Sequence, residues 1–569
     1  MKKAIFITLI AISAQTALAD YHYASHEGSN EYPYTSWATA AHLIQDAVDA
    51  TDPHDTLYIG SGDWYQYVAT GVYDSVALIG MGTDSTFCYN VPDSVYVFVI
   101  DYGCSVENIT FSNDTNGACI RARVFAGVLI NNCRFAYSRT GIGASGYPTI
   151  ITNCVFDNCA RAISAYIWEG DFFISNNLIM YAYDGWAMYL QVYSAIVQNN
   201  IIISTPGVVV SAMLSGQIDG EVVIRNNVAV GGRGGIAVDA QWKYNNTVYN
   251  TGFVNQYGML IDYNDSLFNN SITSCGEPLS VRDSCYFSYN NLWDNEHDPS
   301  FDLFINPVGN ISVNPMYLSD TDFHLQAFSP LIDAGHPGYL DVDGSRSDIG
   351  AYGGPYGESY IYQDLPPAVP DSLSGEVVGD SIILNWRYNT EADFSSYLLH
   401  KDTLSGFEPT IFNLIAEPDT SYYEDTGILP GQNYYYRIAS LDNQGNISDY
   451  SEELAVIQTG VWNGMGVEPP RITTIKSNYP NPFNSQTTII YSVANLGPIP
   501  AQINVNIYDI VGRLVKRLVD ERKEVGVYRI TWDGRDDSGS ECPSGVYFAR
   551  IVQWDLGFLG RHQKLVLIR

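Results

Sequence analysis

Aromatic side chains between positions 166 and 193 offer the clearest chemistry in this sequence. The tyrosines and tryptophans of this stretch are Tyr166, Trp168, Tyr181, Tyr183, Trp186, Tyr189 and Tyr193. Flat aromatic rings stack on sugar rings and on other flat apolar ligands. We therefore take Tyr166, Trp168, Trp186 and Tyr189 as candidate ligand-binding residues for a carbohydrate. The alternative is that these rings form interior stacks or cover the walls of the fold.

Three aspartates in the stretch DVDGSRSD suggest a metal site. Asp341, Asp343 and Asp348 have the oxygen-rich spacing that Ca²⁺ prefers, but the stretch lacks the twelve-residue loop and terminal Glu of an EF-hand. A plain turn held by hydrogen bonds to aspartate is the stronger interpretation. Ca²⁺ is the only cofactor that the sequence suggests.

Support for catalysis is weak. From 20 to 359 the basic residues are nine Arg and Lys243, and no His lies between 108 and 291. Acid–base cleavage of a glycan needs paired carboxylates, or a base beside acidic groups. Acidic residues that could form a pair from distant parts of the chain are Asp184, Asp219, Asp239 and Asp262. We expect binding or adhesion without catalysis, with a polysaccharide lyase or glycoside hydrolase as the alternative.

These residues lie within a repeat that begins with asparagine and continues with β-forming residues. Its nine copies start at Asn108, Asn132, Asn153, Asn177, Asn200, Asn227, Asn246, Asn270 and Asn291, with a mean spacing of about 23 residues. Short strand patterns at such a period, without helical ones, indicate a solenoid. The alternative is a run of unrelated antiparallel hairpins, which the even spacing disfavours.

The solenoid that fits is a right-handed parallel β-helix, in which coils stack roughly 4.8 Å apart. Asparagine tolerates the left-handed conformation of a tight turn, and stacked amides can form ladders along the axis. Residues three places after the asparagine should share a column, namely Phe111, Phe135, Phe156, Met180 and Ile203. Cys133 and Cys154 should stack as free thiols rather than form a strained disulfide.

Both ends of the β-helix carry recognisable patterns. Residues 38–50 have apolar positions at helical spacing, with Leu43, Ile44, Ala47 and Val48 on one face. Together with the strand patterns that follow, the stretch 37–82 resembles the N-terminal cap of pectate-lyase-like β-helix proteins. The stretch from SPLIDAG to DIGAYGG resembles the closing segment of secreted bacterial β-helix repeat proteins. The β-helix with its cap is therefore expected over residues 20–359.

Two further all-β domains follow after proline-containing linkers. In residues 366–459 short alternating strands surround Trp386 and Tyr397, and LPG precedes the tyrosines from Tyr434 to Tyr436, a pattern that resembles a fibronectin type III domain. In residues 472–569 the motifs NYPNPFN, WDG and SGVYF occur in order. They resemble the C-terminal sorting domain of the type IX secretion system, and WDG and SGVYF also occur in flagellar hook-capping proteins.

The start of the chain and its charge indicate the compartment. Residues 1–19 have two lysines, an apolar run and a small-residue cleavage site ending at Ala19, as in a secretory signal peptide. No later stretch is apolar for long enough to span a membrane as a helix. The net charge of −34 argues against nucleic acid as a partner. We expect a secreted or outer-surface protein that engages the type IX secretion machinery and contacts a polysaccharide or another cell-surface ligand.

Overall fold

The chain forms an all-β structure in two compact units, 1–364 and 365–569. This computed structural model describes residues 19–71, 75–92, 94–114, 117–123, 127–146, 149–182, 187–203, 212–214, 221–232, 235–238, 240–251, 257–261, 265–297, 304–305, 307–378, 381–428, 432–457, 472–479, 481–494, 500–553 and 558–568. Within these ranges the only α-helix is α1 (Ile44–Val48).

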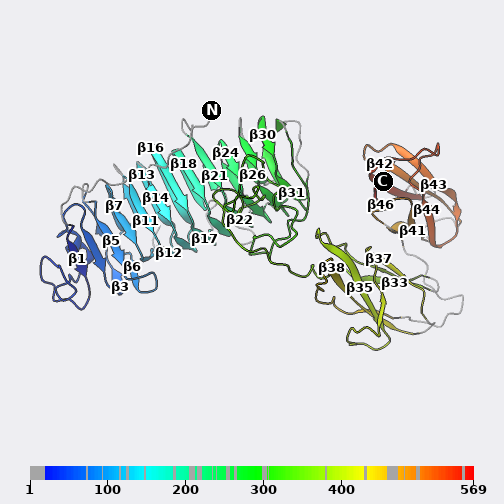
Figure 1. Cartoon of the computed structure of the whole chain (residues 1–569), viewed down its shortest axis with the longest axis horizontal. Helices are drawn as coiled ribbons and strands as arrows, with labels where there is room; N and C mark the ends of the chain where they lie inside the picture. Colours follow the sequence, from blue (N-terminus) through cyan, green and yellow to red (C-terminus); the bar gives the residue numbers. More distant parts are fainter. Residues whose placement is uncertain are drawn as a thin grey trace. The chain divides into compact units, whose positions relative to one another are not determined.

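Parallel strands of the first unit stack coil upon coil (Figure 1), and their pairings define three ladders, two of them joined in one sheet. The first ladder contains β4 (Val68–Ala69), β7 (Tyr96–Asp101), β10 (Ala118–Arg123), β13 (Thr140–Gly146), β16 (Arg161–Ser175), β18 (Met188–Gln198), β20 (Ala212–Leu214), β23 (Ile236–Val238), β26 (Tyr257–Ile261) and β29 (Glu277–Val281). Because β16 and β18 are long, they also continue into the second ladder.

The second ladder runs beside the first. It contains β1 (Tyr21–Ala24), β2 (Thr56–Ile59), β5 (Ala77–Gly80), β8 (Ser105–Glu107), β11 (Val128–Asn131), β14 (Thr149–Thr152), β21 (Val222–Arg225), β24 (Trp242–Tyr244), β27 (Ser266–Phe268), β30 (Cys285–Ser288) and β32 (Phe304–Ile305), with the ends of β16 and β18 between β14 and β21. The third ladder is a separate sheet. It contains β3 (Gly62–Tyr65), β6 (Thr86–Tyr89), β9 (Thr110–Ser112), β12 (Arg134–Ala136), β15 (Val155–Asp157), β17 (Leu178–Met180), β19 (Ile201–Ile203), β22 (Val228–Val230), β25 (Thr247–Tyr249), β28 (Ser271–Thr273) and β31 (Asn291–Trp293).

The recurring asparagines occupy two neighbouring columns, where the sequence suggested one. The first column lies at the bend between the second and third ladders, and its members have positive φ angles: Asn108, Asn132, Asn153, Asn176, Asn199, Asn226, Asn245 and Asn269. The second column lies one residue later, inside the coils, and contains Asn177, Asn200, Asn227, Asn246, Asn270 and Asn290. Its amides form the predicted ladder, since each Nδ2 donates to Oδ1 of the next coil at 2.9 to 3.2 Å, ending on Asn310.

The interior columns confirm part of the predicted stacking. Phe111, Phe135 and Phe156 stack with ring centroids 5.5 and 4.8 Å apart. Met180 and Ile203 were placed wrongly in this column, because it continues through Ile179 and Ile202. Cys133 and Cys154 are buried, free and in one column, as predicted, and this column continues as the inner asparagines.

The N-terminal helix is shorter than the sequence pattern predicts. Ala41 bridges Ala24 of β1 and continues the sheet edge, so the helical turns begin only at Ile44. Ile44, Ala47 and Val48 pack into the core of the coils, whereas Leu43 is 50% exposed and was wrongly assigned to that face.

Residues 311–362, called the closing segment here, pack along the side of the later coils. Asn226 donates Nδ2 to the carbonyl oxygens of Ala351 and Gly353 at 2.8 and 2.6 Å. Asn245 reaches the carbonyl of Asp348 at 2.9 Å. The bend column of asparagines therefore anchors this segment across several coils.

The second unit contains two antiparallel β-sandwiches with separate cores. In the first, β33 (Ser374–Val378), β34 (Ser381–Asn385) and β37 (Tyr422–Asp425) face a sheet of β36 (Leu414–Ala416), β35 (Phe394–Asp402), β38 (Tyr434–Asp442) and β39 (Leu454–Val456). In the second, β40 (Thr474–Tyr479), β41 (Thr487–Val493) and β44 (Gly526–Trp532) face β43 (Leu514–Lys523), β42 (Ala501–Asp509), β45 (Gly545–Gln553) and β46 (Phe558–Leu567).

The core of the first sandwich contains the aromatic residues that the sequence singled out. Trp386 packs edge-on against Tyr397 of β35 at 5.3 Å, and both are buried. Trp386 follows the last residue of β34 directly. Tyr436 donates its hydroxyl to Asp425 at 2.6 Å, while the LPG motif at 429–431 lies outside the described residues.

Candidate functional site

The outward face of the first ladder carries the candidate site. Because successive side chains of a strand point to opposite faces, Ile120, Ile142 and Ile163 lie in the core. The outward-facing residues of β10, β13, β16 and β18 form two columns. One column contains Arg121, Gly143, Ser164 and Tyr189, and the other contains Arg123, Ser145, Tyr166 and Gln191. The face thus presents long Arg and Tyr side chains around small residues.

Arginine side chains from two strands, β10 and β16, contribute to this face. Arg121 donates Nη2 to Ser145 Oγ at 3.3 Å. Arg123 donates to the buried carboxylate of Asp101 at 3.3 Å, yet its side chain stays 56% exposed. The guanidinium of Arg161 lies 5.8 Å from the centre of the Tyr189 ring. Guanidinium groups bind carboxylates and sulfates through paired hydrogen bonds and stack on flat groups.

Tyr166 and Tyr189 form the aromatic part of the site. Their ring centroids are 5.6 Å apart and their planes meet at 53°, with Tyr166 36% exposed. Burial raises the pKa of Tyr189, so its hydroxyl remains a neutral hydrogen-bond donor near neutral pH. Two rings beside guanidinium groups are suited to holding a polar ligand that has apolar faces, such as a sugar chain.

The other aromatic residues predicted for the site are not all brought to it. Tyr193 lies on the same strand as Tyr189 and is 44% exposed. Tyr181 instead follows β17 at a bend after the third ladder, with a positive φ of 58°. Tyr183 and Trp186 lie outside the described residues, as does the side chain of Trp168.

The aspartates proposed for Ca²⁺ accept hydrogen bonds within the closing segment. Asp341 accepts from the N–H groups of Asp348 and Gly354. Asp348 accepts from the N–H of Asp333 and from the hydroxyl of Tyr362, each at 2.8 Å.

Asp343 is engaged separately, because it accepts from both the N–H and the hydroxyl of Ser345. In the described part of the chain the carboxylates of Asp341, Asp343 and Asp348 do not converge as one ligand group. The carboxylates of Asp341, Asp343 and Asp348 thus hold turns of the closing segment through hydrogen bonds.

A buried ion pair inside the coils escaped the sequence analysis. Lys243 is fully buried and donates Nζ to Asp265 at 2.5 Å and to the carbonyl of Ala240 at 3.1 Å. The residues around Lys243 in the sequence do not indicate which acidic residue pairs with it. Asp184, Asp219, Asp239 and Asp262, the acidic residues considered for glycan cleavage, lie outside the described residues.

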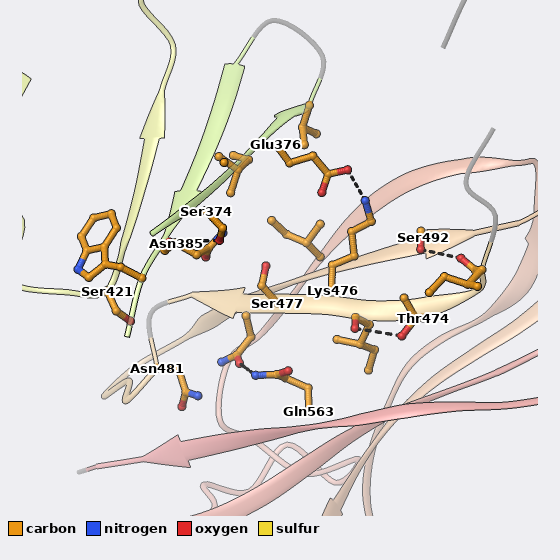
Figure 2. A pocket seen from close by; sticks show the side chains of 18 residues that line it. Ser374, Glu376, Asn385, Ser421, Thr474, Lys476, Ser477, Asn481, Ser492 and Gln563 are labelled. Carbon is orange, nitrogen blue, oxygen red and sulfur yellow. Dashed lines mark hydrogen bonds and ion pairs between the residues drawn. The ribbon is translucent and has the colours of Figure 1, made fainter. Parts of the chain in front are cut away.

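A pocket of about 890 Å³ opens in the second unit (Figure 2). Its lining includes Glu376 and Lys476, which form an ion pair, and Gln563, which donates to Asn478 at 3.0 Å. Glu376 and Lys476 thus pair with each other, as do Gln563 and Asn478, while the amide of Asn481 bonds to backbone groups of β46. The pocket is therefore a weaker candidate for ligand binding than the Arg and Tyr face.

Known families match parts of both units. Residues 97–253 match a family described as right handed beta helix region, and residues 492–556 match the FlgD Ig-like domain. Comparison with curated proteins returns no match. Among the described helices, none is long and apolar enough to cross a membrane.

Several solved structures resemble individual parts. A Fn3-like protein from Clostridium thermocellum is 30% identical over 16% of this chain and 90% of its own, with a TM-score of 0.14. Dimeric latent PorU from Porphyromonas gingivalis is 17% identical over 36% of this chain and 20% of its own, with a TM-score of 0.20. The FN1–FN3 domains of chicken CNTN1 are 18% identical over 36% and 66%, with a TM-score of 0.14.

Fold and family matches together define the class. The chain contains a right-handed parallel β-helix that is followed by β-sandwiches, the second of which matches an Ig-like domain.

Proposed function

We propose that this is an exported protein that binds a polysaccharide on the outward face of the first ladder, without cleaving it. One observation carries the proposal: Arg121, Arg123, Arg161, Tyr166 and Tyr189 gather on one face of a chain whose net charge is −34. Exposed cations are scarce in such a chain, so their grouping beside aromatic rings favours an acidic glycan.

Binding is favoured over cleavage by the groups at this face. Asp101, a carboxylate beside this face, is already engaged by Arg123 and is 4% exposed. Glycosidases need two carboxylates about 5–10 Å apart on either side of the bond that breaks. Stacking and guanidinium contacts hold a sugar chain without supplying such a pair.

The direct test is a binding measurement on residues 20–569 with a panel of acidic and neutral polysaccharides. Tyr166→Ala and Tyr189→Ala should each weaken binding roughly two- to ten-fold, since an aromatic contact contributes about 0.5–1.5 kcal/mol. Tyr65→Ala is the matched control, because Tyr65 is 66% exposed on the third ladder. Equal losses in all three variants, or no binding to any glycan, would refute the proposal.

Export is the second part of the proposal. The signal-like residues 1–19 would direct the chain across the inner membrane. The block 472–569, which resembles type IX sorting domains, would be recognised by that secretion machinery at the outer membrane. Support comes from the Ig-like fold of this block and from the order of its motifs.

A further inference from the structure

The carboxylate of Asp55 lies at the start of the first coil and collects several donors. Asp55 is 5% exposed, and its Oδ2 accepts the N–H of Asp52 at 2.7 Å. His22 faces the same oxygen with Nε2 at 3.2 Å. The other oxygen, Oδ1, accepts the backbone N–H of Asp20 at 2.8 Å.

The nitrogen of Asp20 is held in place by the sheet that follows it. Asp20 immediately precedes β1, which pairs with β2 from Tyr21 opposite Thr56. The carbonyl of Asp20 accepts the N–H of Thr56 at 3.0 Å. The position of this nitrogen beside Asp55 is therefore set by the fold of the first coil.

We propose that Asp55 is the binding site for the chain's own α-ammonium group, which forms when the leader is removed at Ala19–Asp20. This inference rests on the export proposed above. Hydrolysis adds water across that peptide bond, so Ala19 leaves with a carboxylate and the nitrogen of Asp20 becomes an ammonium. A neutral donor thereby becomes a cation next to a buried carboxylate, and charge-assisted hydrogen bonds are roughly twice as strong as neutral ones.

His22 is the other ionisable group that faces this carboxylate. Its Nδ1 lies 2.8 Å from the carbonyl of Pro33, which only accepts, so Nδ1 carries a proton. A second proton on Nε2 would compete with the ammonium as the countercharge of Asp55. The carboxylates of Asp20 and Asp52 lie on the same two segments and are exposed.

The test compares two chains released from cleavable fusions, residues 20–569 and residues 19–569. In the longer chain the amine stands one residue away, and Asp20 keeps its amide N–H. The pH dependence of N-terminal acylation, followed by mass spectrometry, gives the pKa of each amine. For the chain that begins at Asp20, the pKa should lie at least one unit above the ordinary value of about 7.7–8.0. Its acylation at neutral pH should be about ten-fold slower than in the longer chain.

Asp55→Asn in the chain that begins at Asp20 should return the amine to its ordinary reactivity. Equal acylation rates in the two unsubstituted chains would overturn the inference, whether or not the Asn variant folds. The natural protein's first residue, read by mass spectrometry of exported material, provides a separate check. Cleavage at another bond would overturn the role proposed for Asp55. The export proposal would still be decided separately, by measuring surface display.

Discussion

Lys243 faces the core of the β-helix at a position where the neighbouring coils place Ile224 and Leu267. Its partner Asp265 is 4% exposed. Removing one member of a buried ion pair leaves the other without a counter-ion, which costs more than replacing both by apolar groups. Burial beside this pair also raises the pKa of Cys285 to about 12, so its thiol stays protonated.

Lys243→Ala should lower the free energy of unfolding of the first unit by about 3–5 kcal/mol. The double variant Lys243→Met with Asp265→Leu should lose much less, because no charge is then left buried. Urea denaturation of both variants and the unchanged chain provides the measurement. If the double variant is as unstable as Lys243→Ala, the shape of the side chains and not their charge determines stability at this position.

Of the five residues named at the candidate site, Tyr166 and Tyr189 could be predicted from the sequence. Clustered tyrosines between 166 and 193 were visible because they are close along the chain. Arg121, Arg123 and Arg161 were missed as a group, because stacking brings them together from two coils. The spacing of Arg121 and Arg123 by two residues was an available signal, since alternate residues of a strand share one face.

At the scale of the element, the inner asparagine ladder determines how the coils stay in register. Asn227 donates Nδ2 to the carbonyls of Val197 and Arg225 at 2.9 Å, and its Oδ1 accepts from Asn200 at 2.9 Å. The amide therefore satisfies buried backbone groups as well as its neighbour in the ladder. Loss of such an amide leaves several buried groups unpaired, each costing about 1–3 kcal/mol.

Asn227→Ala should therefore destabilise the first unit by more than about 1–3 kcal/mol, the cost of one such group. Asn199→Gly is a suitable control, because Asn199 has a positive φ of 54° at the neighbouring bend and glycine adopts that conformation readily. Thermal unfolding of both variants should show a clear loss only for Asn227→Ala. Comparable losses would mean that the inner ladder has no special role.

The repeat could be predicted from the sequence, but its register could not. In the first copies the inner position is Ile109, Cys133 or Cys154, so a single asparagine marks the bend. The copies from Asn176 to Asn270 contain two adjacent asparagines, one at the bend and one inside, whereas in the last copy Tyr289 is at the bend and Asn290 is inside. A pattern of residue types does not distinguish these two, which differ only in backbone conformation and burial.

The closing segment contains a pH-dependent contact of its own, in which the carboxylate of Asp348 accepts from Asp333 and Tyr362. Burial raises the pKa of Asp348 from 3.8 to about 7, although the N–H donated by Asp333 opposes the shift. The folded state therefore binds this proton more tightly than the unfolded chain. The resulting stabilisation is complete below about pH 4 and is lost as the pH rises to about 7.

Asp348→Asn should remove this part of the pH dependence, because the amide cannot titrate. Unfolding of the unchanged chain and the variant, measured by calorimetry from about pH 4 to about pH 7, tests the assignment. The difference in stability between them should change steadily across that range. A constant difference would mean that Asp348 does not titrate as described.

At the scale of the whole molecule, the C-terminal sandwich is proposed to determine where the β-helix is used. A chain lacking residues 472–569 should keep its signal cleavage yet remain in the periplasm, because only the outer-membrane step needs this block. A chain lacking residues 366–457 is the matched control and should still reach the surface. Cell fractionation with surface proteolysis distinguishes these outcomes, and unaltered display of the first variant would refute the export proposal.

The claim that the first ladder binds a polysaccharide without cleaving it is tested most directly by one incubation. The full chain from Asp20 is mixed with each glycan that it retains, and the glycan's length and its reducing and unsaturated ends are then measured. We predict retention that depends on Tyr166 and Tyr189, with no change in glycan length. Release of new ends, abolished by replacing a single carboxylate of the β-helix, would contradict the account and establish an enzyme.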